Sequence, residues 1–258
     1  MTGKVVFVGA GPGDLELITV RGLRALQQAD VVLHDSMINR SLLDGLKARL
    51  IFVGKRGGRH TMDQEEINRL LTEQARQGRR VVRLKGGDGA VFGRLGEEML
   101  YLAGQQVPFE VVPGVTSATA APVFAGIPVT HRGLADSFVV VTAHRSENGP
   151  AVSIPPYHPS TTVILMMALG TTEVWQKLLL EQGYPPDLAV AYVSAGGTQR
   201  QQVLVTTIAE AARRVKAAQL AGPVLAVVGR VVTLREKLAW FDPQGVTAGC
   251  DYYLPEER

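Results

Sequence analysis

Cysteine is almost absent from the 258-residue sequence, which contains only Cys250. A single cysteine cannot form a disulfide within the chain and cannot build a zinc site by itself. Long apolar runs are missing too, because a run such as Val163–Leu169 falls well short of the roughly 20 residues that a membrane helix needs. These absences predict a protein of a reducing compartment, the cytoplasm, with no membrane as a partner.

An excess of charge of one sign is also lacking. The chain has 27 Lys and Arg against 24 Asp and Glu, a net charge of +3. This balance does not call for a polyanionic partner, although basic residues gather at Lys55–His60 and Arg76–Arg80. A binder of single-stranded nucleic acid would carry aromatic residues between the basic ones, and none lie there, so we expect no nucleic-acid partner. The start of the chain lacks the basic and apolar regions of a signal peptide, and we expect none.

Strand patterns alternate with helix patterns in the first half of the chain. The helix patterns are Leu15–Gln28 and Asp63–Gly78, and the second has an acid-rich start and a glycine end. This alternation predicts an α/β domain with a largely parallel sheet covered on both faces. The expected strands are Val5–Gly9, Val31–Asp35, Ile51–Lys55, Val81–Lys85 and Phe109–Gly114.

The second half predicts another α/β domain, with a mixed sheet, because its strand patterns are more continuous and one helical link is missing. The expected strands are Ser137–Ala143, Thr161–Leu169, Leu188–Ser194, Gln202–Ile208 and Pro223–Arg230, with helices at Thr171–Gly183 and Ile208–Ala218. We place the domains at residues 1–115 and 116–242, followed by a tail at 243–258. Ligands of such sheets bind at the carboxyl ends of strands, so we expect the active site in a cleft between the domains.

The first expected strand runs into the glycine-rich loop GAGPGD, Gly9–Asp14. A dinucleotide fingerprint would need a third glycine where Asp14 stands, and Pro12 has no backbone N–H to donate to a pyrophosphate. No Lys-Ser/Thr pair follows, so the loop is not a P-loop either. A nicotinamide dehydrogenase is therefore disfavoured, and a plain turn in which Asp14 caps the next helix stays open.

A second loop repeats this design, since the strand Val81–Lys85 is followed by two glycines and Asp88. Each strand end offers close backbone approach and a carboxylate. That chemistry suits a cationic ligand with a flat ring better than a phosphorylated one. S-adenosylmethionine, with a sulfonium, an ammonium and no phosphate, fits these residues better than NAD does.

Five segments then carry a resemblance to the tetrapyrrole methylases, in the family's order and near its spacing. They are GAGPGD, DVVLHDSMI (Asp30–Ile38), FVGKRGG (Phe52–Gly58), RLKGGDGAVFGRLGEE (Arg83–Glu98) and VPGVTSATAAPVFAGIPVTHRG (Val112–Gly133). The resemblance implies methylation of uroporphyrinogen III at C2 and C7 by S-adenosylmethionine, giving precorrin-2 by way of precorrin-1 and S-adenosylhomocysteine. It implies a homodimer and no metal. A later corrinoid precursor is the alternative substrate.

The resemblance also implies a set of site residues. Those expected to bind the cofactor are Pro12, Gly86, Gly87, Asp88, Val91, Thr116, Ser117, Met167 and Gly197. For Met167, core packing in an apolar strand is an equally good explanation. The polycarboxylate substrate needs fixed cations, and the matching positions are Arg56, Arg94, Glu97, His131 and Arg132.

Acid–base roles fall, by the same resemblance, on Asp35 as proton acceptor and Lys55 as proton donor; Asp35 could instead start a loop or cap a helix. Three positions near the second loop depart from the family's usual pattern. Gly89 stands for a proline, Ala90 for a phenylalanine and Leu95 for a glycine. His34 also replaces a usual tyrosine. We expect the changes at Gly89 and Ala90 to loosen the turn and to remove an aromatic ring from beside the cofactor, and Leu95 to add bulk where the family has bare backbone.

Overall fold

The computed structural model describes residues 2–56, 59–60, 62–144 and 152–245, with the backbone alone at 55–56 and 59–60. The chain divides into two compact units, which meet in sequence between Ser117 and Ala118. The N-terminal unit comprises the described residues up to Ser117, and the C-terminal unit is Ala118–Gly245.

The N-terminal unit is built on a five-stranded sheet in the order β3-β2-β6-β1-β7. Every neighbouring pair in it is parallel, which confirms the predicted parallel sheet. Its strands are β1 (Lys4–Gly9), β2 (Val31–His34), β3 (Arg49–Phe52), β6 (Arg80–Lys85) and β7 (Phe109–Val112). A separate antiparallel pair joins β4 (Lys55–Arg56) to β5 (Arg59–His60).

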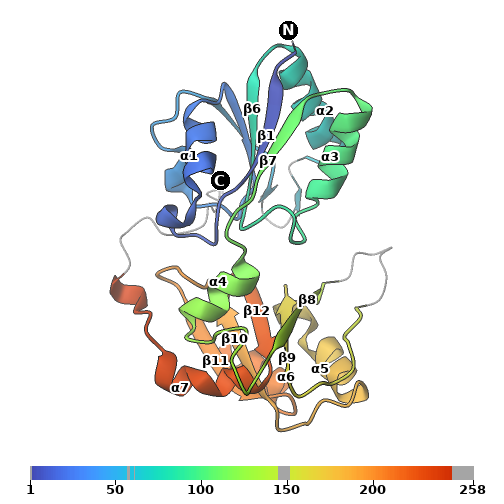
Figure 1. The fold of residues 1–258 in the computed structure, drawn as a ribbon, viewed down its shortest axis with the longest axis vertical. Coiled ribbons are helices and arrows are strands. Elements are labelled where there is room, and N and C mark those ends of the chain that lie inside the picture. The colour runs from blue at the N-terminus through green and yellow to red at the C-terminus, as the bar shows by residue number, and fades with distance from the viewer. Residues whose placement is uncertain (1, 57–58, 61, 145–151, 246–258) are drawn as a thin grey trace. The chain divides into compact units, whose positions relative to one another are not determined.

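Helices cover both faces of this sheet (Figure 1). Because successive side chains of a strand point to opposite faces, β1 contributes residues to two apolar clusters, one on each face of the sheet. Val8 packs in the cluster that contains Leu26 of α1 (Val20–Gln27). Phe7 packs in the other cluster, with Leu71 of α2 (Gln64–Arg76) and Leu102 of α3 (Leu95–Gly104). The predicted two-sided packing is confirmed.

The single helix predicted at Leu15–Gln28 was wrong. A short 3₁₀ helix, η1 (Leu15–Leu17), comes first, and α1 begins only at Val20. Between them Thr19 is extended, and its hydroxyl accepts a hydrogen bond from the Gly22 N–H, which caps α1. The apolar periodicity continues through this break, so the pattern hid the boundary.

Helix α2 begins with a complete capping box. The Asp63 carboxylate accepts from the Glu66 N–H at 2.8 Å, and the Glu66 carboxylate accepts from the Asp63 N–H at 2.8 Å. Asp63→Ala removes the first of these bonds, and we expect the free energy of unfolding to fall by about 1 kcal/mol. Urea denaturation measures this loss. Asp44→Ala, at an exposed position that caps no α-helix, should leave the midpoint nearly unchanged; equal losses would contradict the capping argument.

The C-terminal unit has a five-stranded sheet in the order β11-β10-β12-β9-β8, and it is mixed, as predicted. Only β8 and β9 pair in parallel. The strands are β8 (Ser137–Thr142), β9 (Thr161–Met166), β10 (Ala189–Ser194), β11 (Gln202–Thr207) and β12 (Val224–Val228). Its α-helices are α4 (Ser117–Phe124), α5 (Thr172–Glu181), α6 (Ala211–Ala218) and α7 (Arg235–Leu238), and its 3₁₀ helices are η3 (Leu169–Thr171), η4 (Arg230–Leu234) and η5 (Pro243–Gly245). The other 3₁₀ helix, η2 (Arg40–Leu43), follows β2 in the N-terminal unit.

Each face of this second sheet has its own apolar cluster. One holds Trp175 of α5 and Val215 of α6, and the other holds Ala121 of α4 and Val231 of η4. The sequence did not predict α4, because its small residues and internal Pro122 are poor helix signals. Among the described residues, no helix combines the length and apolar character needed to cross a membrane.

Candidate functional site

The carboxyl ends of β1, β2 and β6 form a switch point in the N-terminal sheet. Strand β6 lies between β1 and β2. The segments that leave β1 and β2 pack on the α1 face, where Leu26 and Leu42 are buried, whereas the segment that leaves β6 leads to α3 on the opposite face. Open α/β sheets bind ligands at such points. The two glycine loops both lie here.

The GAGPGD loop and the loop after β6 are hydrogen-bonded to each other. The Gly11 N–H donates to the Gly87 carbonyl at 3.2 Å, and the Gly87 N–H donates to the Gly11 carbonyl at 2.8 Å. The Ala10 N–H donates to the Lys85 carbonyl at 2.8 Å. The two segments therefore form one surface, which sequence separation alone does not reveal.

Bare backbone packs tightly where these strands end. A Cβ at Gly114 would lie 2.3 Å from the Gly87 carbonyl oxygen, and one at Gly9 would lie 2.6 Å from the Gly114 Cα. A Cβ at Gly86 would lie 2.2 Å from the Met37 carbonyl oxygen. Gly87 differs, because its φ of +60° favours glycine although a Cβ there would come no closer than 3.6 Å to Ser117. A side chain there would therefore be disfavoured by the backbone conformation and not by a clash.

The two acidic residues of the loops both accept backbone hydrogen bonds. The Asp88 carboxylate accepts from the Ala90 N–H at 2.7 Å and from the Gly114 N–H at 3.0 Å, so it ties the β6 loop to the segment after β7. The Asp14 carboxylate accepts from the Glu16 N–H at 2.9 Å and caps η1. The capping role left open for Asp14 is therefore present.

The other expected cofactor contacts of the N-terminal unit lie in the same loops. Pro12 is buried, whereas Val91, Thr116 and Ser117 are half-buried. Ser117 is the first residue of α4, directly after the segment that Asp88 holds. The structure thus brings these four expected contacts onto segments that adjoin Gly86, Gly87 and Asp88, seven expected contacts in all.

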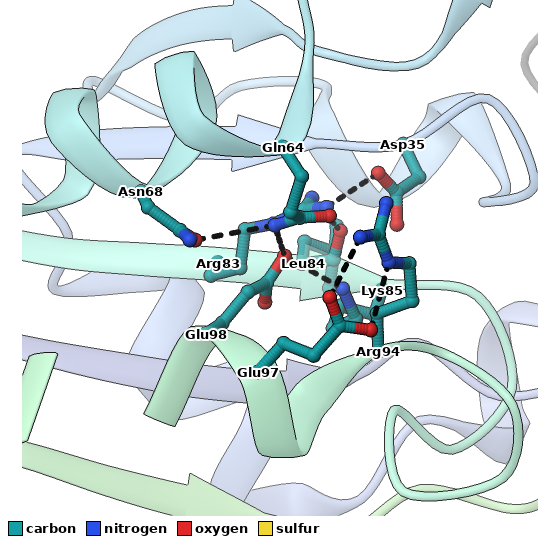
Figure 2. Close-up of polar contacts among 9 residues, drawn as sticks. All are labelled: Asp35, Gln64, Asn68, Arg83, Leu84, Lys85, Arg94, Glu97 and Glu98. Carbon is teal, nitrogen blue, oxygen red and sulfur yellow. Dashed lines mark hydrogen bonds and ion pairs between the residues drawn. The ribbon is translucent and has the colours of Figure 1, made fainter. Parts of the chain in front are cut away.

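Asp35, the expected proton acceptor, follows β2 directly. Its N–H donates to the Leu84 carbonyl at 3.3 Å, which fixes its backbone to β6. Its carboxylate accepts from Arg83 Nη2 at 2.6 Å and is 29% exposed (Figure 2). Asp35 caps no described helix. It is instead one end of a buried ion-pair network.

We call this network the core charge cluster; it consists of Asp35, Arg83, Lys85 and Glu98. Glu98 Oε1 accepts from Arg83 Nε at 3.2 Å and from Lys85 Nζ at 3.0 Å. The side chains of Arg83 and Lys85 are 3% and 5% exposed, and that of Glu98 is 0% exposed. The sequence analysis missed Arg83, Lys85 and Glu98, although two cations spaced by two in an otherwise apolar strand were a usable signal.

Burial and charge shift the two cations of this cluster in opposite directions. Burial by itself would lower the pKa of Arg83, but the Asp35 and Glu98 carboxylates outweigh it and the pKa is raised. Burial lowers the pKa of Lys85, helped by repulsion from Arg83, against the attraction of both carboxylates. Arg83 is therefore the permanent charge of the cluster.

Arg94 and Glu97, both expected to bind substrate, are bound to each other at the surface. Arg94 Nε donates to Glu97 Oε1 at 2.9 Å, and Nη2 donates to Oε2 at 2.6 Å (Figure 2). This bidentate bond lowers the pKa of Glu97. Arg94 also has a φ of +58°, unusual for a residue with a side chain.

The departures from the family pattern have partial explanations. A Cβ at Gly89 would lie 2.9 Å from Lys85 Cδ, so the missing side chain makes room for that buried lysine stem. Leu95 is buried in the cluster between the sheet and α3. His34 is buried beside Phe52, with ring centroids 5.6 Å apart, and burial lowers its pKa. Nothing in the structure explains Ala90, which is exposed.

The remaining expected site residues lie elsewhere. The side chains of Lys55 and Arg56 are outside the described residues. In the C-terminal unit, Met167 follows β9, has a φ of +58° and is 47% exposed, which excludes core packing. Gly197 has a φ of +79°, and a Cβ there would lie 2.7 Å from the Phe124 ring.

Two expected substrate contacts occupy a turn of the C-terminal unit. His131 and Arg132 are both exposed. The His131 carbonyl accepts from the Leu134 N–H at 3.0 Å and from the Ala135 N–H at 2.9 Å, which closes the turn. In the part of the chain that the structure describes, no three His, Cys, Asp or Glu residues are grouped to hold a metal ion.

Together these features define an α/β protein with two sheets, the first of which carries a glycine-lined switch point that lacks a phosphate-binding loop. The model of the tetrapyrrole (corrin/porphyrin) methylases matches residues 4–212. The chain belongs to this family.

Two curated relatives are similar over nearly all of this chain. A uroporphyrinogen-III C-methyltransferase of Methanocaldococcus jannaschii is 47% identical over 238 residues, which are 91% of this chain and 98% of the relative. A siroheme synthase of Nitrosospira multiformis is 45% identical over 252 residues, 96% of this chain and 53% of the relative. The chain thus spans about half the length of the siroheme synthases it matches.

Solved structures of uroporphyrin-III C-methyltransferase from Thermus thermophilus share the fold. One is 40% identical with a TM-score of 0.80, and the match covers 94% of this chain and 99% of that one. Another, complexed with S-adenyl homocysteine, is 38% identical with a TM-score of 0.77, and covers 89% of this chain and 93% of that one. These matches confirm the predicted two-sheet α/β fold.

Proposed function

We propose that this protein is an S-adenosylmethionine-dependent C-methyltransferase that acts on uroporphyrinogen III. It methylates C2 and C7 of the macrocycle, giving precorrin-2 by way of precorrin-1, with S-adenosylhomocysteine as the second product. The observation that supports this best is the pair of hydrogen-bonded glycine loops at the ends of β1 and β6, in a chain whose relatives bear the names given above.

The residues of these loops suit S-adenosylmethionine better than a phosphorylated cofactor. Pro12 has no N–H to donate to a phosphate, and the carboxylates of Asp14 and Asp88 would repel one. Gly87 presents bare backbone beside Ser117, which lets a ligand approach closely. When bound, this cofactor supplies a methyl group already activated by its sulfonium. We assign its binding to Pro12, Gly86, Gly87, Asp88, Val91, Thr116, Ser117, Met167 and Gly197.

The substrate's carboxylates require cations that can change partners. Arg94 meets this need, because its bond to Glu97 joins two exposed side chains. Such pairs contribute at most about 1 kcal/mol to stability. A substrate carboxylate can therefore replace Glu97 on the guanidinium at little cost. We assign substrate binding to Arg56, Arg94, Glu97, His131 and Arg132.

Proton transfer must accompany methylation. Transfer of the methyl group as a cation equivalent adds one positive charge to the macrocycle. The macrocycle must then lose a proton to return to its original charge. Two observations support Asp35 as the acceptor: its carboxylate is partly exposed where β2 ends, and it is hydrogen-bonded to Arg83. We assign the proton acceptor to Asp35 and the proton donor to Lys55.

Incubation with methyl-labelled S-adenosylmethionine and uroporphyrinogen III tests this function. We expect two labelled methyl groups per macrocycle, read by mass spectrometry, and saturable binding of S-adenosylhomocysteine in calorimetry. Binding without methylation would refute the substrate, and a later corrinoid precursor in the same assay would then identify the alternative. Failure to bind S-adenosylhomocysteine, with saturation by NADH, would refute the cofactor.

We also propose, from the family resemblance, that the enzyme is a homodimer. A cytoplasmic location is proposed from the single cysteine. Multi-angle light scattering of the full chain decides the first of these, since a monomer at assay concentration would contradict it.

A further inference from the structure

Strand β6 places two cations inside the N-terminal core. Arg83 and Lys85 alternate with Val82 and Leu84, so both side chains lie on the face that packs against α2 and α3. Both are buried, and so is their partner Glu98. Replacing a buried ion pair by apolar residues of similar volume is often neutral or stabilising. Stability is therefore a weak explanation for these charges, and their arrangement points to another role.

The Arg83 guanidinium is fixed at all three of its nitrogens. Nε donates to Glu98 at 3.2 Å, Nη1 donates to the Leu84 carbonyl at 3.3 Å, and Nη2 donates to Asp35 at 2.6 Å. A guanidinium is planar and rigid, so a group held along one edge has a fixed direction along the other. Because Arg83 is held in the core by Glu98, its bond to Asp35 fixes the position of the Asp35 carboxylate.

Glu98 is the inner anchor of this arrangement. Besides Arg83 and Lys85, its Oε1 accepts from Gln64 Nε2 at 3.2 Å, and the same Gln64 amide donates to Asn68 at 3.2 Å (Figure 2). Helices α2 and α3 and strand β6 therefore all meet at one carboxylate oxygen. Glu98 Oε2 has no hydrogen-bond partner. All of the hydrogen bonds to the Glu98 carboxylate are therefore made by Oε1, the oxygen bonded to Arg83.

Only the Asp35 end of the core charge cluster reaches solvent. Arg83, Lys85 and Glu98 are buried, whereas the Asp35 carboxylate is partly exposed where β2 ends. Solvent therefore reaches the cluster only at the Asp35 carboxylate, which is the proton acceptor in the proposed function. A side chain with freedom to rotate would spend much of its time misaligned, and misplacement by about 1 Å can cost roughly 10²-fold in rate.

We infer that Arg83, anchored by Glu98, is a positioning residue that holds the Asp35 carboxylate in place to accept the proton lost after methyl transfer. This inference rests on the proposed function and adds to it the residues that orient its base. In the proton step, the macrocycle's bond to hydrogen breaks, its electron pair stays on the macrocycle, and the proton goes to a carboxylate oxygen of Asp35.

The same strand offers a matched control. At its other end Arg80 pairs with Asp30 at 3.5 Å, and both side chains are exposed. This pair has the same residue types, an arginine of β6 and an aspartate next to an end of β2, but lies at the end of the strands remote from the glycine loops. If any Arg–Asp pair of this sheet sufficed, Arg80 would matter as much as Arg83.

The test is a double-mutant cycle between Arg83→Met and Asp35→Asn in the methylation assay. Arg83→Met leaves the buried Lys85 and Glu98 charges balanced and lets Asp35 hydrate, so the variant should fold. We expect its kcat to fall about 10- to 100-fold, with KM and the Kd of S-adenosylhomocysteine within about twofold. On the Asp35→Asn background the same change should alter kcat less than about twofold. Arg83→Lys should recover part of the rate, and Arg80→Met should retain it.

Effects that multiply would overturn the inference, because a merely structural role lowers kcat equally on both backgrounds. A raised KM with unchanged kcat would also overturn it, by placing Arg83 in substrate binding. Melting temperatures identify a variant that fails to fold, and Arg83→Lys then replaces Arg83→Met in the cycle. Failure of the proposed function shows instead as a wild-type enzyme that does not methylate, which removes the inference with it.

Discussion

Asp35→Asn is expected to lower the turnover number about 10²- to 10⁴-fold, the usual contribution of a general base. Asparagine has the shape of aspartate, and its amide oxygen can still accept the hydrogen bond from Arg83. It cannot take up a proton at neutral pH. Cofactor affinity should stay within about twofold, because Asp35 lies on the loop after β2 and the expected cofactor contacts of this unit lie after β1, β6 and β7. Initial rates with labelled cofactor and calorimetry with S-adenosylhomocysteine provide the two measurements.

Asp30→Asn is the control for this experiment. Asp30 immediately precedes β2, at the opposite end from Asp35, and accepts from the Arg80 N–H at 2.7 Å. Its substitution removes the same charge from the same segment without approaching the glycine loops, so turnover should be retained. Equal turnover in wild type and Asp35→Asn would remove Asp35 from catalysis and return it to the role of a loop residue.

Gly114→Ala is expected to abolish or severely weaken cofactor binding and to destabilise the N-terminal unit. The new methyl would lie 2.3 Å from the Gly87 carbonyl oxygen and 2.7 Å from the Gly9 Cα. These are backbone atoms of the two joined loops, so neither can move without displacing a strand end. Overpacking of this kind costs about 1–3 kcal/mol. Calorimetry with S-adenosylhomocysteine and urea denaturation measure both effects.

Gly104→Ala makes the same chemical change where there is room for it. Gly104 lies in the last turn of α3, and a Cβ there meets no atom within 4 Å. We expect wild-type cofactor affinity and equal or slightly higher stability, since alanine favours helix more than glycine by about 1 kcal/mol. Unchanged binding in Gly114→Ala would mean that the joined loops can separate, and would remove them from the cofactor site.

Local patterns predicted most strands and helices, because their causes are local. The apolar spacing of Ile67 and Leu71 and the acidic start at Asp63 correctly predicted α2. The break between η1 and α1 was missed, since only the backbone of Ile18 and Thr19 departs from the helix and both side chains fit the pattern. Helix α4 was missed because alanines pack it closely in the core, whereas periodicity methods depend on large apolar residues.

The candidate site was predictable as loops but not as a network. Glycines and acids after strands indicated where a ligand should bind. The partners of Asp35 were not accessible in this way, because Arg83 is 48 residues further along and meets it only through the register of β2 with β6. Glu98 reaches the same arginine from another helix. Long-range pairing of this kind follows from strand order, which no local signal contains.

The core charge cluster also has a consequence for how this sequence can change. With all four groups ionised, Asp35, Arg83, Lys85 and Glu98 sum to zero. A neutral residue at Glu98 leaves both buried cations with only the partly exposed Asp35 carboxylate, and breaking a buried pair in this way typically costs about 3–5 kcal/mol. Libraries that randomise position 98 alone would therefore recover little but glutamate. A coordinated exchange, such as Lys85→Met together with Glu98→Gln, keeps the remaining charges balanced. It is therefore tolerated where Glu98→Gln alone is not.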